Sequence, residues 1–183
     1  MLTVWTKQHV SVLEELESTG RYIARQAYIA KDLEEHAGLV LQAYDWLVTR
    51  AALRYPRPAD VSYPVWLSYS REATMMPTPG SVMLELSIDE SLIMPVNIGK
   101  WGTILNFSYI PADEADRRAH EDLLSSMGVY DAKAFMTPFY PELKRQVIDS
   151  WDRLFDPEVI VNNTDAYGTV WELRREWLVS AAR

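Results

Sequence analysis

An eight-residue stretch near the middle of the chain alternates in polarity, and it constrains the fold more than any other feature. Its apolar positions are Val82, Leu84, Leu86 and Ile88. Successive side chains of a β-strand point to opposite faces of a sheet. Residues 81–88 therefore predict a strand with one face in a hydrophobic core. The other face, which carries Glu85, is expected to meet water or to line a cleft.

Three segments have apolar side chains at helical spacing, in steps of three and four, and a fourth is expected to be a helix with a polar outer face. Helices are predicted over residues 9–19, 32–54, 113–127 and 141–155. Gly20 and Gly128 follow two of these segments in the position of a C-terminal cap. Pro141 opens the last one, where its missing N–H costs nothing.

Further strands are expected on both sides of the alternating segment. They are predicted over residues 2–8, 21–23, 65–69 and 92–94, the last ended by Pro95, with a strand or hairpin over 169–179. Residues 100–107 fit a helix or a strand equally well. Because helices and strands do not alternate regularly, the predicted fold class is α+β. We expect one domain over residues 1–183, with a mixed or mainly antiparallel sheet packed with several helices.

The composition narrows the classes of protein that the chain can belong to. It has 183 residues, no cysteine and a formal net charge of −8. Without cysteine there is no thiolate chemistry, and a reducing, cytoplasmic location is expected. We see no signal peptide and no apolar run long enough for a membrane span. No basic patch is visible, so binding to nucleic acid is not expected, while a protein partner and the oligomeric state stay open.

Several strong catalytic motifs are absent from the sequence, including a Walker loop, G-x-G-x-x-G and G-x-S-x-G. The histidines, His9, His36 and His120, are far apart and lack the spacing of metal ligands. Each is interpreted as an exposed helix residue, and no metal site is predicted. An enzyme that binds a metal through carboxylates alone remains an alternative, because acids from separate strand ends can meet in space.

Large aromatic residues and isolated carboxylates are the remaining candidates for a site. The seven tryptophans are expected to be mainly core residues. Three acids lie among apolar neighbours, namely Asp45, Glu85 and Glu172. A carboxylate that faces a cleft can act as a general base or hold a ribose hydroxyl. Asp45 and Glu85 are interpreted as solvated or paired with an arginine, and Glu172 is placed on the final strand beside Trp171.

Six short aromatic motifs are spread over the chain. They are Trp5-Thr6, Ala43-Tyr44-Asp45-Trp46, Tyr63-Pro64-x-Trp66, Lys100-Trp101-x-x-x-Leu105-Asn106, Phe139-Tyr140-Pro141 and Ser150-Trp151-x-Arg153-x-Phe155. In this order they resemble the signature of a small bacterial and phage family that is catalogued as a domain of unknown function. The resemblance runs nearly end to end. It implies a stand-alone cytoplasmic protein and carries no activity with it.

The start of the chain has a weaker likeness to a second group. A strand that ends in Trp5-Thr6, a helix, and then Gly20-x-Tyr22 is similar to the opening of ADP-ribosyltransferase-like domains. Those domains bind NAD in a cleft of a split sheet, so NAD is the cofactor that this likeness implies. Trp5 and Thr6 stand where that group has histidine or arginine, which departs from its pattern.

The same likeness assigns roles to particular residues. It implies that Glu172 orients the nicotinamide ribose and that Tyr22 stacks on the nicotinamide, as the catalytic residues. The ligand-binding residues expected around them are Trp5, Thr6, Arg71 and Trp171.

Three functions are therefore carried forward. The first is an intracellular accessory protein that binds a host protein or a small ligand, motivated by the methionine-rich loop around Met75 and Met76. The alternatives are an ADP-ribosyltransferase-like enzyme and the carboxylate-metal enzyme. Whether the proline-rich segment 55–64 forms a lid or a fixed loop is left open.

Overall fold

The computed structural model describes residues 1–25, 37–161 and 165–182. They fall into two compact units, Met1–Pro95 with Ala166–Arg183, and Val96–Asp165. The two units are considered one at a time, and a single domain over residues 1–183 stays a prediction. Residues 32–36, which include His36 and the start of a predicted helix, lie outside the described residues. Within the described part, no helix is both long and apolar enough to cross a membrane.

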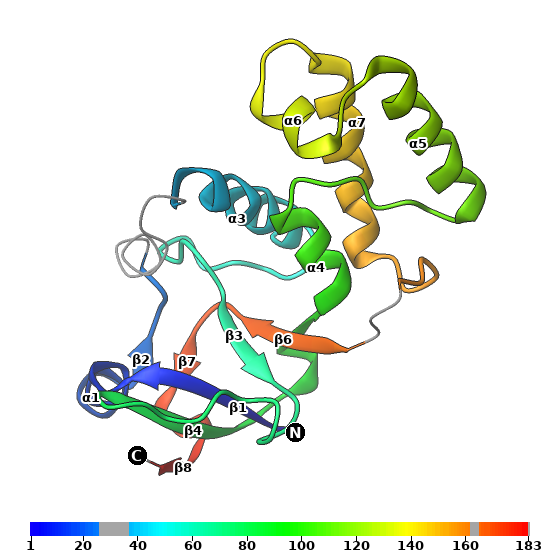
Figure 1. The fold of residues 1–183 in the computed structure, drawn as a ribbon. Helices are drawn as coiled ribbons and strands as arrows, with labels where there is room; N and C mark the ends of the chain where they lie inside the picture. Colours follow the sequence, from blue (N-terminus) through cyan, green and yellow to red (C-terminus); the bar gives the residue numbers. More distant parts are fainter. Residues whose placement is uncertain (26–36, 162–164, 183) are drawn as a thin grey trace. The chain divides into compact units, whose positions relative to one another are not determined.

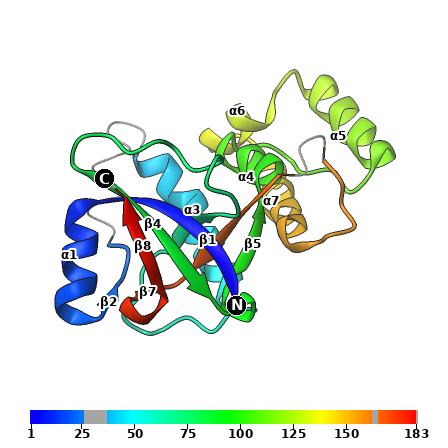
Figure 2. The same ribbon diagram turned by 90° about the horizontal axis from the view of Figure 1, so that it is seen from below.

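A six-stranded sheet forms the framework of the first unit (Figures 1 and 2). Its strands are β1 (Leu2–His9), β3 (Val65–Ser68), β4 (Ser81–Ile88), β5 (Met94–Asn97), β6 (Ala166–Val170) and β8 (Leu178–Ala182). Their order across the sheet is β5-β6-β3-β1-β4-β8. A second sheet pairs β2 (Arg21–Tyr22) with β7 (Leu173–Arg174). The register shows antiparallel pairing of β1 with β3 and β4 and of β3 with β6, which confirms the α+β class.

Strand β4 pairs with β1 along its whole length and with β8 on its other side, as Figure 2 shows. Its predicted apolar positions are completely buried in the core of this unit. On the other face, Glu85 lies opposite Trp5 and accepts a hydrogen bond from the Ser180 hydroxyl at 2.8 Å. The alternation therefore predicted both the strand and its buried face correctly.

Helix α1 (Val10–Thr19) lies against this sheet. The His9 side chain caps its start by accepting from the Ser11 backbone N–H. Gly20 ends it with a φ of 80°, a left-handed conformation that favours glycine. The buried face of the helix carries Val12, Leu13 and Leu16. Both the predicted helix and its predicted cap are confirmed.

Helix α3 (Ala37–Ala51) ends three residues before the predicted boundary at Arg54. Its Tyr44 ring meets the rings of Tyr63 and Trp66 edge to face, with centroids 6.0 and 6.3 Å apart. The Tyr63 hydroxyl donates a hydrogen bond to Asp45 Oδ1 at 2.8 Å. Asp45 is exposed, as the solvated interpretation expected, and its bond to Tyr63 ties the helix to the segment before β3.

Replacing Tyr63 with phenylalanine is expected to lower the free energy of unfolding at neutral pH by about 1–2 kcal/mol, because a hydrogen bond to a charged group is worth about 1.5–3 kcal/mol and the exposure of Asp45 reduces this. Burial and the Asp45 carboxylate raise the pKa of Tyr63 from 10.0 to about 12. The unfolded chain then loses this proton first, so the wild type loses stability relative to the variant as the pH rises from 10.0 to about 12. Urea unfolding of both proteins across this range measures the difference, and a difference that does not change with pH would contradict the prediction.

Two predicted elements near the sheet edges are wrong in detail. Residues Glu90–Leu92 form a short 3-10 helix, η2, and the strand that follows continues through Pro95 into Asn97. Proline has no N–H to donate, but β5 is an edge strand, where a missing donor is tolerated. The predicted strand or hairpin over 169–179 is divided between β6, β7, a 3-10 turn η4 (Arg175–Trp177) and β8.

The second unit is helical (Figure 1). Its elements are α4 (Ile98–Leu105), α5 (Glu114–Met127), α6 (Asp131–Met136), α7 (Pro141–Ser150) and the 3-10 helix η3 (Trp151–Phe155). Residues 100–107, which the sequence left ambiguous, are mainly helical. The predicted helix over 113–127 is confirmed, with Asp113 as its N-cap and Gly128 as its C-cap. Helix α6 was not predicted.

Aromatic rings fill the core of this helical unit. The Trp151 side chain is stacked on Phe135, with centroids 5.5 Å apart, and Phe135 is stacked on Phe107 at 4.6 Å. Trp151 Nε1 donates to the Ser108 carbonyl at 2.9 Å. This confirms the expectation of a core role for Trp151, which is 1% exposed.

Candidate functional site

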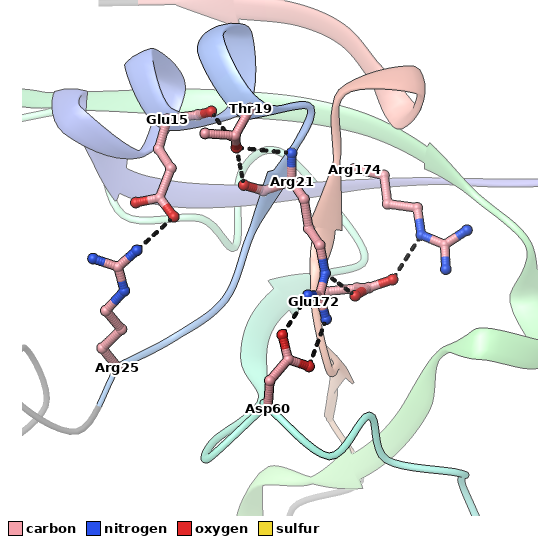
Figure 3. Close-up of polar contacts among 7 residues, drawn as sticks. All are labelled: Glu15, Thr19, Arg21, Arg25, Asp60, Glu172 and Arg174. Carbon is pink, nitrogen blue, oxygen red and sulfur yellow. Dashed lines mark hydrogen bonds and ion pairs between the residues drawn. The ribbon is translucent and has the colours of Figure 1, made fainter.

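The polar cluster around Glu172 contains the residue predicted to be catalytic (Figure 3). Glu172 lies between β6 and β7, so its placement on the final strand is wrong. One carboxylate oxygen accepts from Arg21 Nε, and the other accepts from Arg174 Nε at 2.7 Å. Arg21 also donates to Asp60 through both terminal nitrogens, at 2.6 and 3.1 Å. Four side chains of alternating charge therefore form one network.

The opposite charges in this network favour the ionised form of their partners. Hydrogen bonds from Arg21 lower the pKa of Asp60. The bonds to Asp60, and then those to Glu172, raise the pKa of the Arg21 guanidinium. Both oxygens of Glu172 are thus engaged by arginines, and the network joins β2 and β7 to the segment 55–64. A catalytic role for Glu172 stays a prediction, and calorimetry with NAD on the wild type and Glu172→Ala is its direct test.

Glu172→Gln is expected to lower the free energy of unfolding by about 1–2 kcal/mol. Loss of a hydrogen bond to a charged group costs about 1.5–3 kcal/mol, and solvent exposure of the arginines reduces this. Glu17→Gln, at an exposed position of α1, is the matched control, with an expected change within about 0.5 kcal/mol. Thermal and urea unfolding measure both. If Glu172→Gln were as stable as the control, the network would not have the structural role that its contacts indicate.

The other residues predicted for this site lie in two places. Tyr22 is 6% exposed and sits opposite Leu173 in the β2–β7 pair, within the hydrophobic core. Trp171 precedes Glu172 and donates its Nε1–H to the Tyr55 carbonyl at 3.0 Å, which ties the start of the segment 55–64. Trp171 is therefore adjacent to Glu172 in the chain, and Tyr22 pairs with Leu173, the residue that follows Glu172.

Trp5, Thr6 and Arg71 belong to a different part of the same unit. Trp5 and Thr6 are in β1, where Trp5 faces Ser68 and Thr6 is buried. Arg71 is exposed after β3. Across residues 1–25, 37–161 and 165–182, no hydrogen bond or ion pair joins these three to Glu172. Their role in binding a ligand stays a prediction.

A surface pocket of about 320 Å³ lies in the helical unit, where the sequence predicted no site. Its walls come from the segment after α4, from α5 and from the start of α6. We call it the His120 pocket, after the titratable group in its wall. Its lining includes Tyr109, Arg117, His120, Leu124, Tyr130 and Asp131.

The His120 ring is held on two sides. Its Nε2 lies 2.7 Å from Asp131 Oδ1, and the two side chains are only 9% and 13% exposed. One face of the ring is stacked on Tyr109, with centroids 4.0 Å apart and planes 12° apart. Asp131 Oδ2 accepts from the Tyr109 backbone N–H at 2.8 Å. The expectation that His120 is an exposed helix residue is therefore wrong.

A second layer of contacts fixes Tyr109. Its hydroxyl donates to the Asp116 carboxylate at 2.9 Å, and the Arg153 guanidinium lies over its ring at 5.1 Å from the centroid. Burial raises the pKa of Tyr109, so the hydroxyl stays protonated. For Asp116, burial raises the pKa, but hydrogen bonds from the Ala112 N–H and Tyr109 and the charge of Arg153 outweigh it and lower the pKa overall. An ionised Asp116 thus anchors the ring that supports His120.

The charges in the pocket are compensated within the protein. Arg117 Nη2 is paired with Glu114 at 2.7 Å, and Arg117 is also paired with Glu121. Asp131 is paired with His120 and with the backbone. By contrast, His120 Nδ1 has no hydrogen-bond partner among the described residues, and the Tyr130 side chain is largely exposed. The pocket is thus lined by the His120 imidazole, by aromatic and apolar side chains, and by the paired charges of Arg117 and Glu121.

The sequence held one weak signal for this pocket. Asp116, His120 and Leu124 recur at steps of four and so share a face of α5. Helix α5 has no fully buried apolar residue, so a polar stripe takes the inward position. The partner Asp131 lies eleven residues after His120, beyond Gly128, and only the fold brings it close. Within the described residues, no group of three or more histidine, aspartate or glutamate side chains is placed to hold a metal ion.

The fold and the pocket define an α+β protein with a small polar and aromatic pocket in its helical unit. A family model described as Domain of unknown function (DUF3841) matches residues 3–179. The chain therefore belongs to this family. Neither a curated protein nor a solved structure gives a significant match.

Proposed function

We propose that this is a bacterial or phage accessory protein that works in the cytoplasm by binding a small ligand in the His120 pocket. The observation that carries the proposal is the ordered pair of His120 and Asp131 in the wall of that pocket. Ligand sites are typically concavities with apolar and aromatic walls and a few fixed polar groups. The volume of about 320 Å³ lies at the lower end of the range for such sites, about 300–1,000 Å³.

The surroundings of the His120–Asp131 pair favour a binding role over a purely structural one. The His120–Asp131 pair lines the wall of the pocket. Tyr109 and Asp131 hold the imidazole in one orientation, so little rotational freedom is lost when a ligand binds. Such a fixed polar group surrounded by apolar walls is suited to recognise one molecule.

The proposal is tested by filling the pocket. Ala132 lies in the pocket wall, and Ala132→Phe places a ring in the cavity. Ala119, which is exposed on α5, gives the matched control Ala119→Phe. We expect small ring compounds to bind the wild type and the control, detected by ligand-observed NMR, and to lose binding to Ala132→Phe. Fragments that bind all three proteins equally, or none of them, would contradict the proposal.

A protein partner is a second candidate function. Met75 and Met76 are 75% and 78% exposed, and flexible methionine side chains adapt to a partner surface. A partner that the wild type recovers at one-to-one stoichiometry, and that the double variant Met75→Ser, Met76→Ser does not, would support this function. Equal recovery by both proteins would count against it.

A further inference from the structure

The ligand that the His120 pocket selects can be described more closely from the state of its imidazole. A neutral imidazole has one N–H donor and one nitrogen acceptor, and the hydrogen bond of one nitrogen determines the role of the other. Asp131 Oδ1 lies 2.7 Å from His120 Nε2. An ionised carboxylate only accepts hydrogen bonds, so the proton of a neutral His120 is on Nε2. Nδ1 is then left as an acceptor.

We propose, on the basis of the small-ligand function above, that His120 is a specificity-determining acceptor and that the pocket takes an uncharged ring compound with an N–H or O–H donor. Nδ1 accepts that hydrogen bond, and no covalent step is involved. The inference depends on three features of the pocket: the orientation of the imidazole, its compensated charges and its apolar walls.

The pairing of the charges within the protein favours an uncharged ligand. Arg117 is engaged by two glutamates, and Asp131 is engaged by His120 and the Tyr109 N–H. An uncharged ligand leaves these pairs in place, whereas an ionic ligand would compete with the partners that they already have. Leu124 and the exposed Tyr130 ring then supply apolar and aromatic surface for a planar molecule.

The first experiment reads the imidazole directly in the wild-type protein. Nitrogen-15 NMR of the histidine rings distinguishes the two neutral tautomers and the doubly protonated form. His120 is expected to carry its proton on Nε2, the nitrogen that faces Asp131. His9, which is exposed and accepts a hydrogen bond from the Ser11 backbone N–H, serves as the internal comparison. A proton on Nδ1, or on both nitrogens, would overturn the inference whether or not a ligand binds.

The second experiment uses a matched pair of probes, indole and 1-methylindole. They have the same ring, but only indole has an N–H donor. We expect indole to bind about tenfold more tightly, which is the worth of one ordinary hydrogen bond. The difference should disappear in His120→Phe, which keeps a ring against Tyr109 but has no acceptor.

The outcomes separate this inference from the function on which it rests. Equal binding of the two probes in the His120 pocket, blocked by Ala132→Phe, keeps the small-ligand function and overturns the acceptor role. No binding of either probe, together with no binding in the fragment screen, overturns both. If His120→Phe fails to fold, the tautomer measured in the wild type still decides the inference.

Discussion

Trp151→Ala is expected to lower the free energy of unfolding of the helical unit by about 3–5 kcal/mol, the range for removing a buried large aromatic side chain. The side chain is 1% exposed, is stacked on Phe135, and donates to the Ser108 carbonyl at 2.9 Å. The variant leaves a cavity beneath the aromatic core and an unpaired carbonyl. Urea unfolding followed by circular dichroism measures the loss, and hydrogen exchange of the α7 amides locates it.

Two controls make this result specific. Phe139 is 80% exposed, so Phe139→Ala should change the free energy of unfolding by no more than about 0.5 kcal/mol. Trp151→Phe keeps an aromatic ring but lacks the N–H donor, and it should lie between the two. A loss for Trp151→Ala no larger than that of Phe139→Ala would show that this ring is not the centre of the unit's core.

Lys100→Ala is expected to have the second largest effect, a loss of about 2–4 kcal/mol. Lys100 is 4% exposed, and its ammonium donates to the carbonyls of Arg153 and Asp156 at 3.0 and 2.6 Å. These carbonyls lie where η3 ends, and the Arg153 carbonyl also accepts from the Asp156 backbone N–H at 3.2 Å. Removing the side chain takes away two hydrogen bonds from a charged donor, which are worth about 1.5–3 kcal/mol each, and the exposure of Asp156 reduces the second.

The pH dependence of this variant gives a second test. Burial lowers the pKa of Lys100 below its usual value of 10.5. In the window between the lowered pKa and 10.5, the unfolded chain binds more protons, so the wild type gains stability as the pH rises. The difference in free energy of unfolding between the wild type and Lys100→Ala should therefore increase through this window. A second variant, Lys100→Met, keeps most of the apolar stem and so separates the effect of packing from that of hydrogen bonding. A difference that shrinks with rising pH would contradict the assigned shift.

Local signals in the sequence were sufficient for the elements that they define alone. The alternation of β4 and the glycine caps of α1 and α5 depend on neighbouring residues, and each is present in the structure. Pro95 was misjudged because proline breaks a central strand but not an edge strand, and the position of a strand in a sheet is not a local property. Residues 100–107 were ambiguous because a short apolar run fits either period.

The candidate site was harder to predict because it depends on distant partners. Glu172 was recognised as unusual, but its partner Arg21, and the Asp60 that Arg21 also binds, lie more than a hundred positions away from it. His120 was misjudged because its partner Asp131 starts a six-residue helix with weak periodicity. An inward polar stripe on a helix looks like a solvated face until the neighbouring helix is known.

The two outermost strands of the large sheet differ in a way that affects how the protein behaves when crowded. Strand β5 carries Pro95 at an exposed position, so it lacks one of the donors that an added strand would need. Strand β8 ends the sheet on the other side with small, uncharged and mostly exposed residues between Val179 and Ala182. Edge-to-edge association, if conditions force it, therefore starts at β8. A single lysine or proline introduced there would be the first change to make in a variant meant for high concentration.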